Sequence, residues 1–204
     1  MDRRTIKTRQ MLQDALLSLL REQPFEDIEI QAITDRADTA RVTFYRHYGT
    51  KEELLADVLE TIYQEMQALM QVVSVEQLMD LRQPPPSLIL FEFLEKDRTL
   101  FKKLFTGSTS AFIQRRFQNY IVEQVMLTFR DAPQYADLPI GLIANNLAAC
   151  MFGNIMWWLS EDVPYPGSYM ARMSLWTAMI GMMTLIGRVD ILTTPPADAW
   201  RVPL

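Results

Sequence analysis

The chain has 204 residues, of which 49% are hydrophobic and 22% charged, and its net charge at pH 7 is −5. A chain this apolar can bury a substantial core, which excludes wholesale disorder, and its acidity excludes a protein that coats nucleic acid by bulk charge. With one cysteine and one histidine, an internal disulfide, a thiolate metal cage or a Ser–His–Asp triad is not expected. We therefore predict no enzyme activity, no catalytic or metal-binding residues and no cofactor.

The first fifty residues predict a helical segment of three helices. The chain has only seven glycines and few alternating, strand-like stretches, which indicates an all-α protein. Leu12, Leu16 and Leu19 recur at helical spacing, so 4–22 is expected to be an amphipathic helix that ends before a proline. Short helices over 30–36 and 40–47 follow, separated by a tight turn. This helix-turn-helix pattern predicts contact with DNA.

A long helix is expected to begin after Thr50 and to continue to about residue 69. The segment 50–53 resembles a capping box, in which the Thr50 hydroxyl accepts from the Glu53 N–H and the Glu53 carboxylate accepts from the Thr50 N–H. Further helices are expected over 87–96, 98–105, 110–130, 139–159 and 168–188, about nine helices in all. The proline-containing tail, 191–204, is expected to be irregular.

The distribution of charge favours DNA contact at the N-terminus. The first fifty residues carry eight basic and eight acidic side chains, so the whole negative excess belongs to the rest of the chain. Residues 1–9 are charged and do not resemble a secretory signal, and a single cysteine suits the reduced cytoplasm. The apolar run 140–159 contains three asparagines, which favours a buried helix over a membrane span.

The second short helix has the side chains that a recognition helix needs. Phe44 and Tyr48 lie four residues apart and can anchor the helix to the core. Arg41 can reach a guanine edge, and Thr43 can donate to a base or contact a thymine methyl. DNA phosphate oxygens can accept hydrogen bonds from three further side chains of this segment: Tyr45, His47 and Lys51.

Residues 44–55, which read FYRHYGTKEELL, resemble the DNA-binding signature of the tetracycline-repressor (TetR) family. The segments 9–25 and 28–37 fit the first two helices of the same family. Residues 90–94 and the Trp-Trp-Leu of 157–159 resemble one group of TetR-like C-terminal domains. By this resemblance the DNA contacts are Gln31, Thr39, Arg41, Thr43, Tyr45, His47 and Lys51.

The resemblance implies a homodimer with two N-terminal DNA-binding heads, because this is the family's architecture. It predicts a DNA-binding domain over 4–64, with the helix-turn-helix at about 28–48, and a ligand-binding and dimerisation domain over 65–190. Most members repress neighbouring promoters and are released by a small molecule. The predicted partners are therefore operator DNA, a second copy of the chain and a small effector, without a membrane.

The recognition segment departs from the family pattern at several positions. Asp38 stands where the turn usually has glycine, and aspartate tolerates the left-handed backbone better than most residues. Ala40 cannot cap the recognition helix, so Thr39 is expected to cap it after a one-residue shift. Val42 replaces a common glycine, which predicts a less close approach of the backbone to DNA.

The second half is rich in large apolar side chains, which suit both a core and a ligand pocket. The last two helices are apolar nearly all round and contain small residues that permit close approach, which predicts a four-helix dimer interface. The expected pocket residues are Phe91, Phe101, Phe105, Phe112, Phe117, Tyr120 and Met126. The expected interface residues are Ala144, Ala148, Ala149, Gly153, Trp157, Met179 and Met183.

The leading prediction is a sequence-specific transcriptional repressor released by a small apolar or amphipathic ligand. A DNA-binding regulator without a ligand and an activator are the alternatives that remain open. An enzyme that uses the apolar cavity is disfavoured, because neither a nucleophile–base pair nor a metal constellation is present in the sequence.

Overall fold

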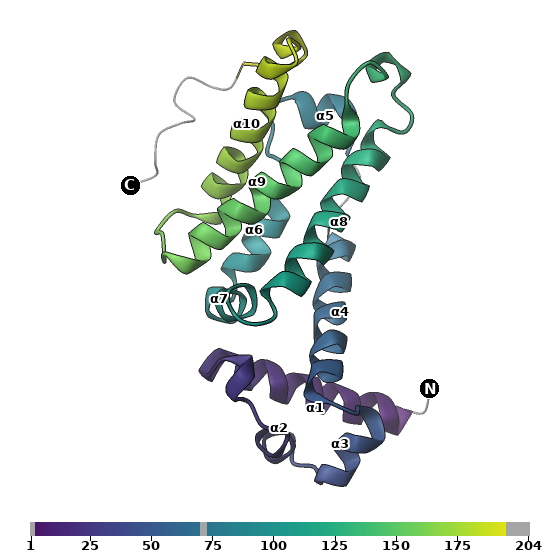
Figure 1. Cartoon of the computed structure of the whole chain (residues 1–204), viewed down its shortest axis with the longest axis vertical. Helices are drawn as coiled ribbons and strands as arrows, with labels where there is room; N and C mark the ends of the chain where they lie inside the picture. The colour runs from purple at the N-terminus through teal and green to yellow at the C-terminus, as the bar shows by residue number, and fades with distance from the viewer. Residues whose placement is uncertain (1–2, 70–72, 195–204) are drawn as a thin grey trace. The chain divides into compact units, whose positions relative to one another are not determined.

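A computed structural model describes residues 3–69 and 73–194, and these residues form α-helices and turns without strands (Figure 1). This confirms the all-α prediction. Residues 195–204, most of the expected irregular tail, lie outside the described residues. The α-helices are α1 (Arg3–Glu22), α2 (Ile30–Arg36), α3 (Arg41–His47), α4 (Lys51–Leu69), α5 (Val75–Met79), α6 (Leu88–Glu95), α7 (Arg98–Thr106), α8 (Ser110–Phe129), α9 (Ile140–Ser160) and α10 (Gly167–Leu185).

The chain divides into two compact units. The N-terminal unit comprises Met1–Ala68 and Thr99–Ser110, and the C-terminal unit comprises Leu69–Arg98 and Ala111–Leu204. The predicted boundary at 64/65 falls inside α4, and most of α7 groups with the N-terminal residues rather than with the C-terminal domain. Glu26 ties this segment to the N-terminal unit, because its carboxylate accepts a 2.7 Å hydrogen bond from the Ser108 N–H.

The core of the N-terminal unit follows the predicted apolar spacing. Leu12 and Leu16 of α1 are fully buried, as are Ile33 of α2 and Phe44 of α3. Helix α2 packs against both α1 and α3. Phe25 follows the proline after α1 and folds back into this core, where it is 8% exposed.

In the C-terminal unit, α10 packs against α9 and α6. The approach to α6 requires a glycine at the start of α10, because a Cβ at Gly167 would lie 2.9 Å from the Glu95 carboxylate and 3.0 Å from the Phe91 carbonyl oxygen. The Arg98 guanidinium closes the end of α9 by donating to the carbonyls of Trp158 and Val163 at 2.8 and 3.1 Å.

Helix α9 is the one helix in the described part of the chain that is long and apolar enough to cross a membrane, by length and composition alone. One of its faces packs inside the C-terminal unit, where Ile143 and Ile155 are buried. Asn154 donates to the Ser174 hydroxyl of α10 at 3.1 Å, a polar contact between packed helices. These contacts hold one face of α9 inside the C-terminal unit.

The short helix α5 was not predicted, although its signal was present in the sequence. Ser74 accepts from the Gln77 N–H at 3.2 Å, and the Gln77 side chain accepts from the Ser74 N–H at 2.9 Å. This is a complete capping box of the Ser-x-x-Gln type.

Candidate DNA-binding site

Helix α3 is held in place by two aromatic anchors and a left-handed turn. Phe44 is fully buried, Tyr48 is 4% exposed, and their ring centroids lie 5.9 Å apart. Asp38, in the turn after α2, has a φ of 48°, which confirms the expected left-handed aspartate. The anchors fix one face of α3 against the core and leave the opposite face for a partner.

The opposite face of α3 exposes Arg41, Val42, Tyr45 and Arg46. Val42 is 68% exposed and Tyr45 is 48% exposed, so both side chains are accessible to a partner. The Arg41 guanidinium donates to the Tyr45 hydroxyl at 3.3 Å and lies 5.8 Å from the centroid of its ring. The two side chains thus form one polar and aromatic surface that can contact DNA.

The structure brings some of the predicted DNA contacts together. Gln31, Arg41 and Lys51 border one open hollow of about 460 Å³ at the start of α2, α3 and α4. The Gln31 amide donates to Asp35 at 2.7 Å and is exposed. Of the remaining predicted contacts, Tyr45 is exposed. The other three are half-buried; they are Thr39, Thr43 and His47.

The expected caps are only partly observed. Helix α3 has no side-chain cap, so the expectation that Thr39 replaces the missing cap is wrong. At α4 the Thr50 hydroxyl accepts from the Glu53 N–H at 3.2 Å as predicted, but the Glu53 carboxylate accepts from the Gly49 N–H at 2.7 Å instead of the Thr50 N–H. The Glu53 carboxylate therefore bonds to the N–H one residue earlier than in a standard capping box.

Lys51 is bound within the protein. Its ammonium donates to the backbone carbonyls of Phe25, Glu26 and Ile28 at 3.0, 3.0 and 2.8 Å. It also lies 4.8 Å from the centroid of the Phe25 ring. The three carbonyls belong to the turn between α1 and α2, so Lys51 joins this turn to the start of α4. The contact of Lys51 with a DNA phosphate stays a prediction. It would require the ammonium to donate to a phosphate oxygen in addition to, or in place of, these carbonyls.

We expect Lys51→Met to lower the free energy of unfolding by about 2 kcal/mol, because it keeps the aliphatic stem and removes three charge-assisted hydrogen bonds. Urea denaturation followed by circular dichroism measures this change. Lys7→Met is the matched control, since Lys7 is exposed on α1. Equal stability of the two variants would contradict the structural role of Lys51.

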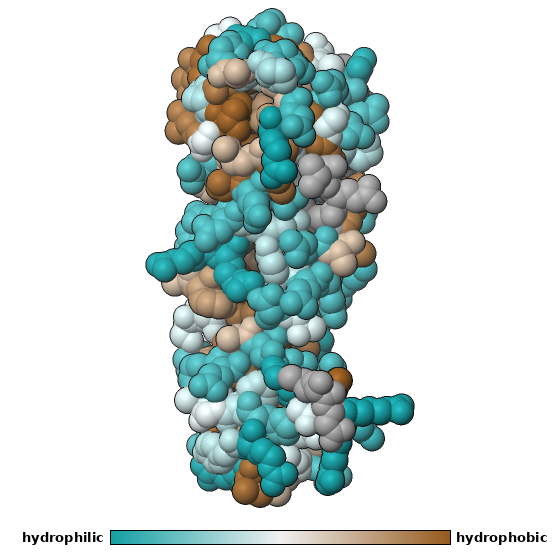
Figure 2. Space-filling model, turned by 90° about the vertical axis from the view of Figure 1, so that its right-hand side faces the viewer, coloured by the Kyte–Doolittle hydropathy of each residue, from teal (hydrophilic) through white to brown (hydrophobic). Residues whose placement is uncertain are grey.

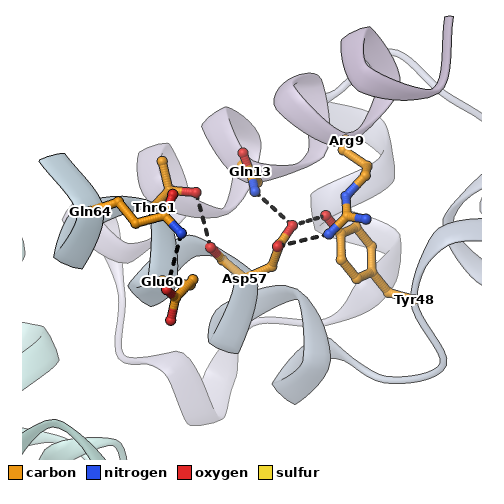
Figure 3. A network of polar contacts seen from close by, with 7 residues as sticks. All are labelled: Arg9, Gln13, Tyr48, Asp57, Glu60, Thr61 and Gln64. Atoms are coloured by element: carbon orange, nitrogen blue, oxygen red, sulfur yellow. Dashed lines mark hydrogen bonds and ion pairs between the residues drawn. The ribbon is translucent and has the colours of Figure 1, made fainter. Parts of the chain in front are cut away.

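A second tie is centred on Asp57 of α4 (Figure 3). Its carboxylate accepts from Arg9 and Gln13 of α1, at 2.7 Å each, and from the Tyr48 hydroxyl at 2.5 Å. Thr61 adds a bond to the Asp57 backbone carbonyl at 3.0 Å. The network links α1, the end of α3 and α4. It could not be predicted from local sequence patterns, because Gln13 and Asp57 are 44 residues apart in the chain.

The network also fixes the charge of its members. Burial by itself raises the pKa of Asp57, but the hydrogen bonds from Arg9, Tyr48 and Gln13 outweigh it and lower the pKa below the ordinary value. Burial and the hydrogen bond to Asp57 together raise the pKa of the Tyr48 hydroxyl. At neutral pH, Asp57 is therefore a carboxylate that accepts hydrogen bonds, and Tyr48 is a neutral donor.

Comparison with known proteins agrees with this geometry. Residues 12–58 match the family described as bacterial regulatory proteins, tetR family, and residues 85–178 match a family described as transcriptional regulator C-terminal region. The chain belongs to the TetR family. TetR family members are transcriptional regulators, a class without enzymatic activity, and they bind DNA.

Individual relatives are similar over different parts of this TetR family protein. The uncharacterized HTH-type transcriptional regulator YxbF of Bacillus subtilis (strain 168) is 45% identical over 60 residues, which cover 29% of the chain and only 16% of that protein. The structure of the dihydroxyacetone kinase operon activator DhaS aligns with 87% of this chain over 97% of the DhaS chain, with a TM-score of 0.62 and 16% identity. A tetR-family regulator from Streptomyces coelicolor covers 94% of both chains, with a TM-score of 0.65 and 16% identity. The structural neighbours show a shared fold.

The C-terminal unit of this TetR family protein has a cavity of about 60 Å³ that none of the predicted pocket residues borders. Phe91 and Phe117 are buried and pack against Trp158 and Phe152, with centroids 5.7 Å apart in each pair. Phe101, Phe105 and Tyr120 are also buried. Phe112 and Met126 are 47% and 48% exposed, because their positions on α8 face away from the packed side.

The predicted interface residues divide into two groups. Ala149, Gly153 and Trp157 are exposed on one stripe of α9. The other four are buried inside the C-terminal unit of the single chain; they are Ala144, Ala148, Met179 and Met183. On α10, the exposed positions include Gly181 and Leu185. Figure 2 shows hydrophobic residues, in brown, on the surface of this unit in the upper half of the view.

Proposed function

We propose that this protein is a cytoplasmic, homodimeric repressor that binds a specific operator and leaves it when a small apolar or amphipathic ligand binds the C-terminal unit. The observation that carries DNA reading is the exposed Arg41–Tyr45 surface on a helix fixed by Phe44 and Tyr48. Side chains that are exposed on an anchored helix can enter the major groove without unfolding.

We expect Arg41→Ala to lower affinity for a duplex selected from a random library by about 1–3 kcal/mol and to reduce discrimination against unrelated duplexes. Arg41 supplies the planar, bidentate donors that read a guanine edge. Fluorescence anisotropy at several salt concentrations measures both quantities.

The control is Arg130→Ala, which removes the same charge from the C-terminal unit. An equal loss of affinity on selected and unrelated duplexes for Arg41→Ala would show that Arg41 contacts phosphate and not bases.

The exposed stripe on α9 supports the dimer. Leu142, Ala149, Gly153 and Trp157 follow one another at near-helical intervals, and an added Cβ at Gly153 would meet nothing within 4 Å. Small and large apolar residues on one stripe permit the close approach of a second copy. A symmetric dimer would present two α3 helices to two half-sites, which on DNA lie about 34 Å apart when they are one helical turn apart.

Release by a ligand requires that the ligand bind the DNA-competent and DNA-incompetent states with different affinity, typically by about 1–3 kcal/mol. Helix α4 is the physical candidate for transmitting this difference. It begins beside α3, carries Lys51 and Asp57, and continues without interruption to Leu69. A change in its tilt would move the bonded middle of α1 and the end of α3 with it.

Activation is the second candidate, since DhaS, which shares the fold, is named an operon activator. The same DNA-reading surface serves both outcomes. A promoter–reporter assay with and without the protein distinguishes them: repression lowers the signal, and activation raises it.

A further inference from the structure

The second residue of α3 places an apolar side chain on the face of the helix that points away from the core. Val42 is 68% exposed, whereas Phe44, two residues later, is fully buried. The neighbours of Val42 three and four positions along the helix, Tyr45 and Arg46, are exposed as well. Val42 therefore lies within the same exposed surface as the polar side chains of α3.

The polar neighbours do not cover Val42. The Arg41 guanidinium donates to the Tyr45 hydroxyl at 3.3 Å and lies 5.8 Å from the centroid of its ring, so these two side chains contact each other. A valine in a helix is held largely in one rotamer, because both methyl groups branch from Cβ. Val42 thus presents two methyl groups in a defined position on the surface of α3.

The chemistry of this side chain limits what it can recognise on DNA. Valine has no donor or acceptor, so it cannot bond to a phosphate or to the polar edge of a base. The apolar group that unmodified base pairs display in the major groove is the 5-methyl group of thymine. Contact between this methyl group and Val42 removes apolar surface of both from water.

The position of Val42 in the helix suits this contact. The N-terminal residues of a recognition helix are the ones that contact base edges, and Val42 is the second residue of α3. The sequence suggested Thr43 as a side chain for a thymine methyl group. Thr43 is only half-buried, however, and lies about 100° further round the helix, away from Tyr45. The structure favours Val42 over Thr43 for this contact.

From these observations we propose that Val42 is a specificity-determining residue, which contacts the 5-methyl group of a thymine in each half-site of the operator. This inference rests on the proposed sequence-specific DNA binding and adds a chemical feature of the operator. It also gives a role to the valine that stands in place of the glycine common in the family, because an apolar side-chain contact replaces a close approach of the backbone.

The test uses the full-length protein and the duplex selected from a random library. Each thymine of a half-site is replaced in turn, in both half-sites together, by deoxyuridine, which lacks only the 5-methyl group and pairs in the same way. Fluorescence anisotropy measures the affinity. We expect one position at which deoxyuridine weakens binding about threefold to fourfold for each methyl group, or about tenfold for the two half-sites. Val42→Ala should bind the thymine and deoxyuridine duplexes at this position nearly equally, because the partner of the methyl group is gone.

Two variants are the controls. Val189→Ala makes the same change at an exposed valine of the C-terminal unit and should keep the preference of about tenfold for thymine. Thr43→Ser removes only the methyl group of Thr43 and should keep the ratio of the two affinities as well.

The proposal is overturned if Val42→Ala keeps the preference for thymine, or if Thr43→Ser loses it. It is also overturned if no position of the selected duplex is sensitive to deoxyuridine, and this result leaves sequence-specific binding by the protein intact. A wild-type protein that selects no duplex would contradict the proposed function itself, and this inference with it.

Discussion

Asp57→Ala is expected to lower the free energy of unfolding of the N-terminal unit by about 3 kcal/mol. The substitution removes the acceptor shared by Arg9, Gln13 and Tyr48 and leaves the buried Tyr48 hydroxyl without its partner. Urea denaturation measures the loss, and hydrogen exchange of the α1 and α3 amides locates it. Because α3 is tied to α1 and α4 through this carboxylate, operator affinity should fall as well.

The pH dependence gives a second signature of the same residue. Since the pKa of Asp57 is lowered in the folded state, its contribution is present at neutral pH and is lost as pH falls below the ordinary value of 3.8. The wild type should therefore lose more stability than Asp57→Ala in this acidic range. Asp14→Ala is the matched control, since Asp14 is exposed on α1 and should change stability by less than about 0.5 kcal/mol.

Ala149→Glu is expected to convert the proposed dimer into a monomer and to weaken operator binding by a factor of about 100 or more, because two linked heads bind far more tightly than one. Ala149 is exposed in the single chain, so the glutamate is compatible with the folded unit. Opposite a second copy, however, it would be buried without a partner. Light scattering and anisotropy measure the two effects.

Ala111→Glu provides the control, because it makes the same change at an exposed alanine on α8. It should remain a dimer with unchanged operator affinity. If Ala149→Glu also remains a dimer, the exposed stripe of α9 is not the interface.

The helices of the N-terminal unit could be predicted because their signals are local. Apolar spacing marks α1, and Thr50 marks the start of α4 through a bond to a residue three positions later. The role of Lys51 could not be predicted in this way, because its three carbonyl partners lie 23 to 26 residues earlier in the chain. A lysine at this position is as compatible with a phosphate contact as with backbone carbonyls. Only the folded structure shows that three carbonyls surround it.

The C-terminal unit was less predictable for a related reason. Helical spacing shows which residues share a stripe, but not which stripe faces the core when a helix is apolar nearly all round. On α9, Ala148 and Ala149 are neighbours of the same type, yet Ala148 is buried and Ala149 is exposed.

The affinity of the wild-type protein for its selected duplex, compared with a scrambled duplex of equal length at physiological salt, tests the central claim most directly. A helix that reads bases through the Arg41–Tyr45 surface predicts a preference of about 1,000-fold or more for the selected duplex. A ratio near one, with both affinities falling equally as salt rises, would contradict sequence-specific recognition by α3.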